Sequence, residues 1–391
     1  MKNSKKSLNN SSPFRVGMVG GGEGSFSGPV HRWAINLTEK GILVAGAPEI
    51  DPSRAQATGE KIGLSRIYRT YKDMLREEQK LSINDRIECI VISTPNNSHF
   101  EIAKQFLLAG IPVICEKPFT LNLKEAQKLQ DIAKKTNTPL MISHNYSGYP
   151  LVKEMRKMIK DGTLGEIRQI FTNYIQGWLL PPLAKARMQQ IGWRMDPKIV
   201  GLSTCLTDIG SHAEHLSRYI SGLSIDSICA DLTRSEGRVL DDSAAVLARY
   251  TNGAKGIYNI SQTSAGEEND LHIRIYGTLA GLEWKQMDPN TVYLKRNGHP
   301  TEVIRAGTSY LSPEAQSLTR LPAGHPEAFV EAFANLYVDF FKVLKDRREG
   351  KTIHLENYEF PTVEDGVKSM AFIEAAVESD KKRQAWVKLR A

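Results

Sequence analysis

Residues 14–31 read FRVGMVGGGEGSFSGPVH, an apolar run that ends in glycines and leads into a helical pattern. The apolar run predicts a buried strand, and the glycines predict a tight turn from that strand into a helix. Glycines at such a turn let backbone amides approach a pyrophosphate, which then lies against the positive end of the helix. This stretch therefore predicts a dinucleotide site at the first strand–helix turn of a doubly wound α/β domain.

The spacing of these glycines departs from the usual GxGxxG pattern. Gly20 and Gly22 supply the first two glycines, and Gly28 fits the third if the loop carries about three extra residues. Glu49 ends the second predicted strand, where a carboxylate can accept hydrogen bonds from both hydroxyls of an adenosine ribose, which favours NAD. Arg54 is near enough in sequence to pair with a 2′-phosphate, so NADP stays open as an alternative cofactor.

Short apolar runs alternate with helical stretches as far as residue 145. Strands are predicted at 14–22, 42–50, 87–95, 111–118 and 139–145, and helices at 30–41, 51–63, 71–80, 98–110 and 123–137. Strands that alternate with helices of this length indicate βαβ units and a parallel sheet. Residues 14–145 are therefore predicted to form a Rossmann dinucleotide-binding domain.

The pattern changes after Tyr146. LVKEMRKMIKDGTLG, at 151–165, predicts a helix that ends in a glycine turn, and Asn252-Gly253 marks a hairpin between two apolar runs. Period-two alternation, typical of half-buried antiparallel strands, follows at 271–277, 281–286 and 291–296. The last long helix is predicted at 326–350, with an apolar stripe for packing. Residues 146–391 are therefore predicted to form an α+β domain with an open, mainly antiparallel sheet.

Length and composition exclude several classes of protein. The 391 residues are too many for one small core and predict two domains, and no apolar stretch approaches the ~20 residues of a membrane span. The net charge of +7 comes from Lys and Arg spread along the chain without a dense basic block, which argues against a nucleic-acid partner. Residues 1–13 are basic and polar and lack the apolar core of a signal peptide, so a disordered tail and a cytoplasmic location are expected.

Polar residues follow two of the predicted buried segments. The run GIPVICEKP, at 110–118, ends on Glu116 and Lys117, and a parallel sheet binds ligands at the carboxyl ends of its strands. A solvated pair at a strand end would also be unremarkable. A second cluster, TCLTDIGSHAEHL at 204–216, carries Asp208 and His212 four residues apart, which places both on one face of a helix.

Lys117, Asp208 and His212 supply the groups that oxidation of an alcohol by hydride transfer requires. A histidine can take the alcohol proton near neutral pH, a lysine can hold the developing alkoxide by charge, and an aspartate can share the substrate hydroxyls and orient the histidine. Asp208, His212 and His215 also have metal-compatible spacings, but the sequence offers no convincing third ligand. No metal is predicted.

Together these motifs resemble those of the glucose–fructose oxidoreductase / inositol dehydrogenase (Gfo/Idh/MocA) family. The resemblance covers nearly all of the chain after the tail and rests on VGGG with Gly28 and His31, Asp51-Pro52, STPN with His99 after it, CEKP, and DIGSH. It implies an N-terminal Rossmann domain and a C-terminal domain, 146–391, for substrate binding and oligomerisation. It also implies that Lys117, Asp208 and His212 line the substrate site. The residues expected beside the cofactor are Thr94, Pro95, Asn96, His99 and, near the nicotinamide, Glu116.

The start of the second domain departs from the family pattern, because His144, Asn145 and Tyr146 stand where Asn-Arg-Arg is usual. Aromatic faces stack on sugar rings and amides bracket hydroxyl pairs, although an individual tryptophan is more often a packing residue. The substrate-binding candidates are Asn145, Tyr146, Gln176, Trp178, Trp193, Arg194 and Gln262. Residues 185–201 could fold over the substrate as a lid.

The sequence therefore predicts an NAD(P)-dependent dehydrogenase of a ring hydroxyl in a sugar, glycoside or cyclitol. QGW at 176–178 and GHPEAFVEAFANLY at 324–337 resemble a branch of the family in which oxidation at the glucosyl C3 position is a candidate reaction. A redox-neutral NAD-dependent glycosidase would use the same site. A dinucleotide-sensing regulator would lack catalysis, and retention of Lys117, Asp208 and His212 argues against it. The resemblance further implies a homodimer or homotetramer.

Overall fold

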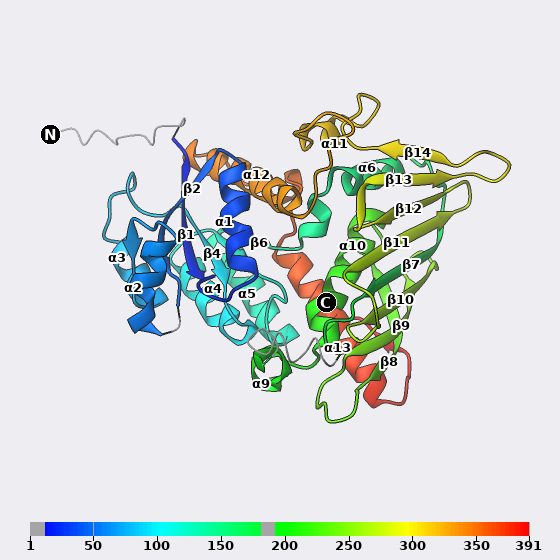
Figure 1. The fold of residues 1–391 in the computed structure, drawn as a ribbon, viewed down its shortest axis with the longest axis horizontal. Coiled ribbons are helices and arrows are strands. Elements are labelled where there is room, and N and C mark those ends of the chain that lie inside the picture. Colours follow the sequence, from blue (N-terminus) through cyan, green and yellow to red (C-terminus); the bar gives the residue numbers. More distant parts are fainter. Residues whose placement is uncertain (1–11, 50, 181–191, 391) are drawn as a thin grey trace.

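The structure of the chain is a computed structural model that describes residues 12–49, 51–180 and 192–390. Two sheets face each other across a layer of helices (Figure 1). The predicted disordered tail, 1–13, lies outside the described residues except for its last two positions.

The N-terminal sheet has six strands in the order β3-β2-β1-β4-β5-β6, and all of its strand pairs are parallel. Its strands are β1 (Phe14–Gly20), β2 (Gly41–Ala47), β3 (Arg66–Ile67), β4 (Cys89–Ser93), β5 (Val113–Cys115) and β6 (Leu140–Ile142). The order reverses between β1 and β4, where a crevice opens beyond the carboxyl ends of the strands. The predicted Rossmann sheet is confirmed. The two-residue β3 was not predicted, because it is too short to show a pattern.

Five helices connect these strands: α1 (Ser27–Leu37), α2 (Pro52–Lys61), α3 (Tyr71–Glu78), α4 (His99–Leu108) and α5 (Leu123–Thr136). All five were predicted, with ends shifted by a few residues. The shift matters at α1, which begins before the predicted position and so places Gly28 in its first turn.

The C-terminal sheet has nine strands in the order β14-β13-β12-β11-β7-β10-β9-β8-β15. They are β7 (Ile167–Ile175), β8 (Ile225–Thr233), β9 (Ser243–Tyr250), β10 (Lys255–Ser261), β11 (Asp270–Gly277), β12 (Gly281–Lys285), β13 (Asp288–Lys295), β14 (Glu302–Arg305) and β15 (Val387–Lys388). Only β7 and β10 pair in parallel, so the predicted, mainly antiparallel sheet is confirmed. The predicted hairpin at Asn252-Gly253 joins β9 to β10.

One face of this sheet is covered by α6 (Pro150–Lys160), α10 (Ser211–Ser221) and α13 (Val363–Lys381) (Figure 1). Side chains along β9 alternate between buried and exposed, as expected of a sheet with one covered face. The prediction that the helix at 326–350 is the last long one was wrong, because α13 follows it. This helix packs between β8 and α5, so its apolar residues lie on several sides and form no single stripe. The described part of residues 146–391 also contains two short helices, α9 (Pro197–Val200) and α11 (Pro313–Ser317).

The predicted apolar stripe at 326–350 forms α12 (Phe329–Arg348), which packs on the N-terminal sheet rather than on its own. Phe341 stacks on Phe14 of β1 with ring centroids 5.1 Å apart, and Tyr337 lies fully buried in the same cluster. The C-terminal part of the chain therefore covers one face of the Rossmann sheet. As a result, Phe329 and Phe333, at the start of α12, reach the crevice at the sheet edge.

Candidate active site

A cavity of about 1320 Å³ runs from the glycine turn after β1 to the first turns of α10. Gly22 and Glu49 line it at one end, and Lys117, Asp208 and His212 line it at the other. Sites for one small molecule usually measure about 300–1,000 Å³. The cavity therefore has room for a dinucleotide together with a second, smaller molecule.

The glycine turn leaves no space for side chains at its predicted positions. A Cβ on Gly20 would lie 2.3 Å from the Ser93 carbonyl oxygen, and one on Gly28 would lie 2.2 Å from the Gly21 carbonyl oxygen. Gly28 therefore corresponds to the third glycine of the GxGxxG pattern, since it lets the first turn of α1 pack directly against the loop. The extra loop residues lie before α1, where Gly24 faces open space. This cradle fits a pyrophosphate held by backbone amides at a helix N-terminus.

Glu49 closes the β2 side of the cradle. Its carboxylate accepts hydrogen bonds from the backbone N–H of Glu23 (2.9 Å) and the hydroxyl of Thr58 (2.9 Å). A Cβ on Gly22 would lie 2.4 Å from the same carboxylate, which explains a glycine there. Arg54 lies 3.9 Å from Glu49 but bonds to Glu23 at 3.0 Å. The carboxylate is thus fixed at the position where an adenosine ribose would lie.

Substitution of Glu49 by alanine is expected to raise the Kd of NAD by roughly 10- to 100-fold, the usual cost of a charged hydrogen bond. The Kd of NADP should rise less, because its 2′-phosphate meets no carboxylate in the variant. Calorimetry with both cofactors measures this difference, and Glu60→Ala on the exposed face of α2 is the control. If the Kd values of NAD and NADP rose by the same factor, Glu49 would not be the residue that binds the ribose hydroxyls.

The residues after β4 divide into two groups. Thr94, Pro95 and Asn96 line the cavity, as expected of cofactor-side residues. His99 does not line it. The His99 ring is buried, with Nδ1 2.9 Å from the Pro118 carbonyl oxygen and Nε2 2.9 Å from the Thr94 carbonyl oxygen. The structure therefore corrects its expected role as a cofactor contact: His99 ties the loop after β4 to the loop after β5.

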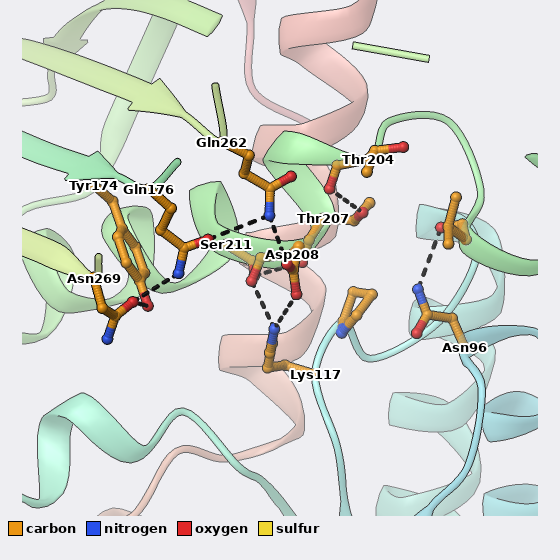
Figure 2. A network of polar contacts seen from close by, with 12 residues as sticks. Asn96, Lys117, Tyr174, Gln176, Thr204, Thr207, Asp208, Ser211, Gln262 and Asn269 are labelled. Atoms are coloured by element: carbon orange, nitrogen blue, oxygen red, sulfur yellow. Dashed lines mark hydrogen bonds and ion pairs between the residues drawn. The ribbon is translucent and has the colours of Figure 1, made fainter. Parts of the chain in front are cut away.

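Lys117 and Asp208 meet across the two domains although 91 residues separate them. The Lys117 Nζ donates to Asp208 Oδ1 at 2.9 Å and to the Asp208 carbonyl oxygen at 2.6 Å (Figure 2). The Gln262 amide donates to Asp208 Oδ2 at 2.7 Å. Burial alone would raise the pKa of Asp208, but Lys117 and Arg194 outweigh it and hold the pKa below its ordinary value. Asp208 is therefore a carboxylate with both oxygens engaged.

Asp208 and His212 were predicted to lie one turn apart on one helix. Asp208 instead lies in a single π-helical turn, Leu206–Gly210, that leads into α10, and His212 lies in α10 itself. Such wide turns often occur at functional sites. Both side chains still line the cavity.

His212 is 6% exposed, and its Nδ1 is buried without a hydrogen-bond partner among the described residues. The ring packs edge-on against Tyr146, with centroids 4.9 Å apart. Burial, and then the charge of Lys117, hold the pKa of His212 well below 6.5. The imidazole is therefore neutral at physiological pH and able to accept a proton.

Glu116, the residue before Lys117, also lines the cavity. Its Oε1 lies 2.7 Å from Nε2 of His31 in α1, and Nδ1 of the same ring lies 2.7 Å from the hydroxyl of Tyr337 in α12. Burial would raise the pKa of Glu116, but the contact with His31 and the nearby Lys117 lower it below its usual value.

Amide and phenol groups extend from Asp208 along the second sheet, as Figure 2 shows. Gln176 lies between Gln262 (3.4 Å) and Asn269 (2.7 Å), and Tyr174 donates to Asn269 at 3.0 Å. The network ends at the Tyr146 hydroxyl, 2.6 Å from that of Tyr174. Sequence reasoning found Gln176, Gln262 and Tyr146 but missed Tyr174 and Asn269. From Ile170 on, β7 alternates between buried and half-buried side chains, and this period could have indicated Tyr174, whereas Asn269 lies just before β11 and carries no pattern.

Two predicted aromatic residues, Trp178 and Trp193, and the nearby Arg194 also line the cavity, as does Asn145. The Arg194 guanidinium lies 4.2 Å from the Trp193 ring centre and 5.8 Å from that of Trp178. The Trp178 indole N–H donates to Gln176 at 2.8 Å. Of the predicted lid, 185–201, the part up to residue 191 lies outside the described residues. The amide of Asn96 donates to the Val200 carbonyl oxygen at 3.4 Å, which links α9 to the cofactor loop.

Within the described ranges, no cluster of three or more His, Cys, Asp or Glu could hold a metal ion. In the same part of the chain, no helix is long and apolar enough to span a membrane.

Two sequence-family models match the chain. One, described as the oxidoreductase family with an NAD-binding Rossmann fold (GFO_IDH_MocA), matches residues 14–144, and the other, the GFO/IDH/MocA C-terminal domain, matches residues 152–283. The chain belongs to the GFO/IDH/MocA oxidoreductase family. With the glycine cradle, this match makes it an NAD(P)-dependent oxidoreductase that acts on CH–OH donors.

Individual family members resemble this GFO/IDH/MocA protein over almost its whole length. An uncharacterized oxidoreductase of Bacillus subtilis, YfiI, is 33% identical over 386 residues, covering 97% of this chain and 98% of the relative. The levoglucosan dehydrogenase of Pseudarthrobacter phenanthrenivorans is 26% identical over 404 residues, covering 96% and 97%. The crystal structure of an inositol dehydrogenase homolog from Azotobacter vinelandii, complexed with NADH and myo-inositol, is 32% identical with a TM-score of 0.90, covering 98% and 99%.

Proposed function

We propose that this oxidoreductase oxidises a ring hydroxyl of a sugar, a glycoside or a cyclitol, with NAD as hydride acceptor. The observation that carries the proposal is the meeting of Lys117, Asp208 and His212 at one end of a cavity that begins at a dinucleotide cradle. The myo-inositol complex of the Azotobacter vinelandii homolog and the name of the levoglucosan dehydrogenase support a polyhydroxylated ring as substrate. Where the substrate is a glycoside, the hydroxyl at the glucosyl C3 position is one of the proposed sites of oxidation.

The chemistry divides between the cofactor and three side chains. Bound NAD supplies the acceptor for the hydride that leaves the ring carbon. His212, neutral because burial lowers its pKa, takes the hydroxyl proton on its accessible ring nitrogen. The Lys117 ammonium stabilises the alkoxide that develops on the same oxygen, and Asp208 holds the ammonium in place. A neighbouring hydroxyl of the ring can bond to Asp208, which orients the substrate.

The remaining cavity walls suit a ring with many hydroxyls. The Gln176, Asn269 and Tyr174 groups present donors and acceptors along one side, and Asn145 has a buried amide nitrogen without a partner in the described chain. Trp178 and Trp193 offer aromatic faces for the C–H face of a sugar. We assign these residues, together with Tyr146 and Arg194, to substrate binding. Residues 14–145 would hold the cofactor and 146–391 the substrate.

The proposal is tested with purified protein, NAD or NADP, and a panel of inositols, free sugars, sugar acids and glycosides. Absorbance at 340 nm should rise with NAD and at least one ring polyol. If absorbance did not rise with any compound although calorimetry showed that NAD binds, the proposed dehydrogenase activity would be contradicted. Cleavage of a glycoside under those conditions would identify the redox-neutral glycosidase instead.

We further propose that the uncovered face of the nine-stranded sheet mediates a homodimer or homotetramer. Leu247, Ile257 and Phe171 form a row across β9, β10 and β7 on this face, and Leu247 and Ile257 are 47% and 42% exposed. Light scattering should give a multiple of the 43.6 kDa chain mass, and the double substitution Leu247→Glu, Ile257→Glu should reduce it to one chain. A monomeric wild type would contradict the proposal.

A further inference from the structure

The order of the strands places the two ends of a bound dinucleotide. Glu49 follows β2, the glycine turn follows β1, and Glu116 follows β5, which lies beyond β4 in the sheet. With the ribose carboxylate on the β2 side and the pyrophosphate over the turn, the nicotinamide half must extend over β4 toward β5. Glu116 therefore places a carboxylate of the first sheet at the reacting end of the cofactor, beside Lys117.

Three side chains, Tyr337, His31 and Glu116, are linked by hydrogen bonds, and counting donors and acceptors assigns the protons among them. The Tyr337 hydroxyl is fully buried, and His31 is its one hydrogen-bond partner in the described structure. If both ring nitrogens of His31 carried protons, the Tyr337 O–H would have no acceptor, which is costly for a buried donor. The satisfied arrangement is therefore a Tyr337 O–H that donates to Nδ1 and an Nε2–H that donates to Glu116. This arrangement leaves His31 neutral and the charge of Glu116 uncompensated by it.

The charge of Lys117 also acts on Glu116 and lowers its pKa, but the Lys117 ammonium itself is bonded to a different carboxylate. Lys117 is bonded to Asp208 at 2.9 Å, and the charge of Arg194 also acts on Asp208. The nicotinamide ring is positively charged in NAD⁺ and neutral in NADH, so a nearby ionised carboxylate attracts the oxidised ring and not the reduced one. The Glu116 side chain is 12% exposed and lines the cavity, so solvent screens this attraction only in part.

We infer that Tyr337 and His31 are positioning residues that hold Glu116 as a charged carboxylate beside the nicotinamide, and that Glu116 thereby favours binding of NAD⁺ over NADH. The inference rests on the NAD site and not on the identity of the substrate. It assigns a role to a residue of α12, which lies outside the Rossmann domain and follows Glu116 by more than two hundred residues.

The test is the ratio of the Kd of NADH to the Kd of NAD⁺, measured by calorimetry on wild type and variants without any substrate. Glu116→Gln keeps the shape and the contact with His31 but removes the charge, and should lower the ratio by roughly threefold to tenfold. Tyr337→Phe removes the donor to His31, so the ring no longer has a fixed tautomer facing Glu116. The ratio should fall in the same direction, by a smaller factor.

Tyr250→Phe is the matched control, because it also removes a buried hydroxyl, one bonded to Tyr258 at 2.8 Å under the second sheet. It should lose similar stability and leave the ratio unchanged. A wild-type ratio in Glu116→Gln, or equal weakening of both cofactor forms, would overturn the charge role. A wild-type ratio in Tyr337→Phe alone would overturn the positioning role. Because no substrate is used, either failure leaves the proposed dehydrogenase reaction standing.

Discussion

Replacement of Lys117 by alanine is expected to lower kcat/KM for ring oxidation by roughly 100- to 1,000-fold, the usual cost of removing a charge-stabilising donor from an active site. The loss arises because the ammonium that stabilises the developing alkoxide is removed, and because Asp208 loses the partner at 2.9 Å that orients it. The Kd of NAD should change little, since the pyrophosphate and ribose contacts lie at the other end of the cavity. Steady-state assays and calorimetry measure the two quantities.

Lys104→Ala is the control for this substitution. Lys104 pairs with Glu101 on the surface of α4, away from the cavity, so its loss should leave kcat/KM unchanged. Thermal unfolding should show that the Lys117 variant remains folded at the assay temperature. Near wild-type turnover in Lys117→Ala would remove this residue from the chemistry.

Replacement of His212 by glutamine should lower kcat by roughly 100- to 10,000-fold, the contribution of a well-placed general base. The wild-type pH profile carries a second signature. Oxidation needs neutral His212, and a lowered pKa means that the neutral form persists to more acid pH. The acid limb of kcat/KM should therefore lie below pH 6.5 rather than at it.

The control is His325→Gln, which alters an exposed histidine whose Nδ1 lies 3.2 Å from the Pro322 carbonyl oxygen. Both the rate and the acid limb should match wild type. If His212→Gln retained the wild-type rate with the same acid limb, another group would have to be the base.

Sequence patterns predicted the elements that a continuous apolar run, a single apolar face or a pair of turn residues marks. The strands of the Rossmann domain other than β3, its five helices and the Asn252-Gly253 hairpin fall in this class. The partner of α12 was not predictable, because an apolar stripe states that a face is buried but not against what. α13 was missed for the opposite reason, since a helix packed on several sides shows no stripe.

The candidate site shows the same division. Lys117, Asp208 and His212 were found because their motifs occur at a strand end and on a helix, and the structure brings them to one cavity. The role of His99 was missed because its partners are the backbone carbonyls of Thr94 and Pro118, which have no sequence signature. Tyr337 appeared only as a member of a packing stripe. Its hydroxyl gains a role solely because α12 crosses to the first domain and meets His31.

Transfer of deuterium from a labelled substrate to the cofactor tests the central claim most directly. The active ring polyol from the substrate panel, carrying deuterium on its ring carbons, is incubated with the enzyme and NAD, and the cofactor is analysed by mass spectrometry. The account predicts reduced cofactor that carries one deuterium from the ring, with formation slowed strongly in Lys117→Ala and His212→Gln. Substrate consumption with the cofactor left oxidised and unlabelled would contradict net hydride transfer in this cavity.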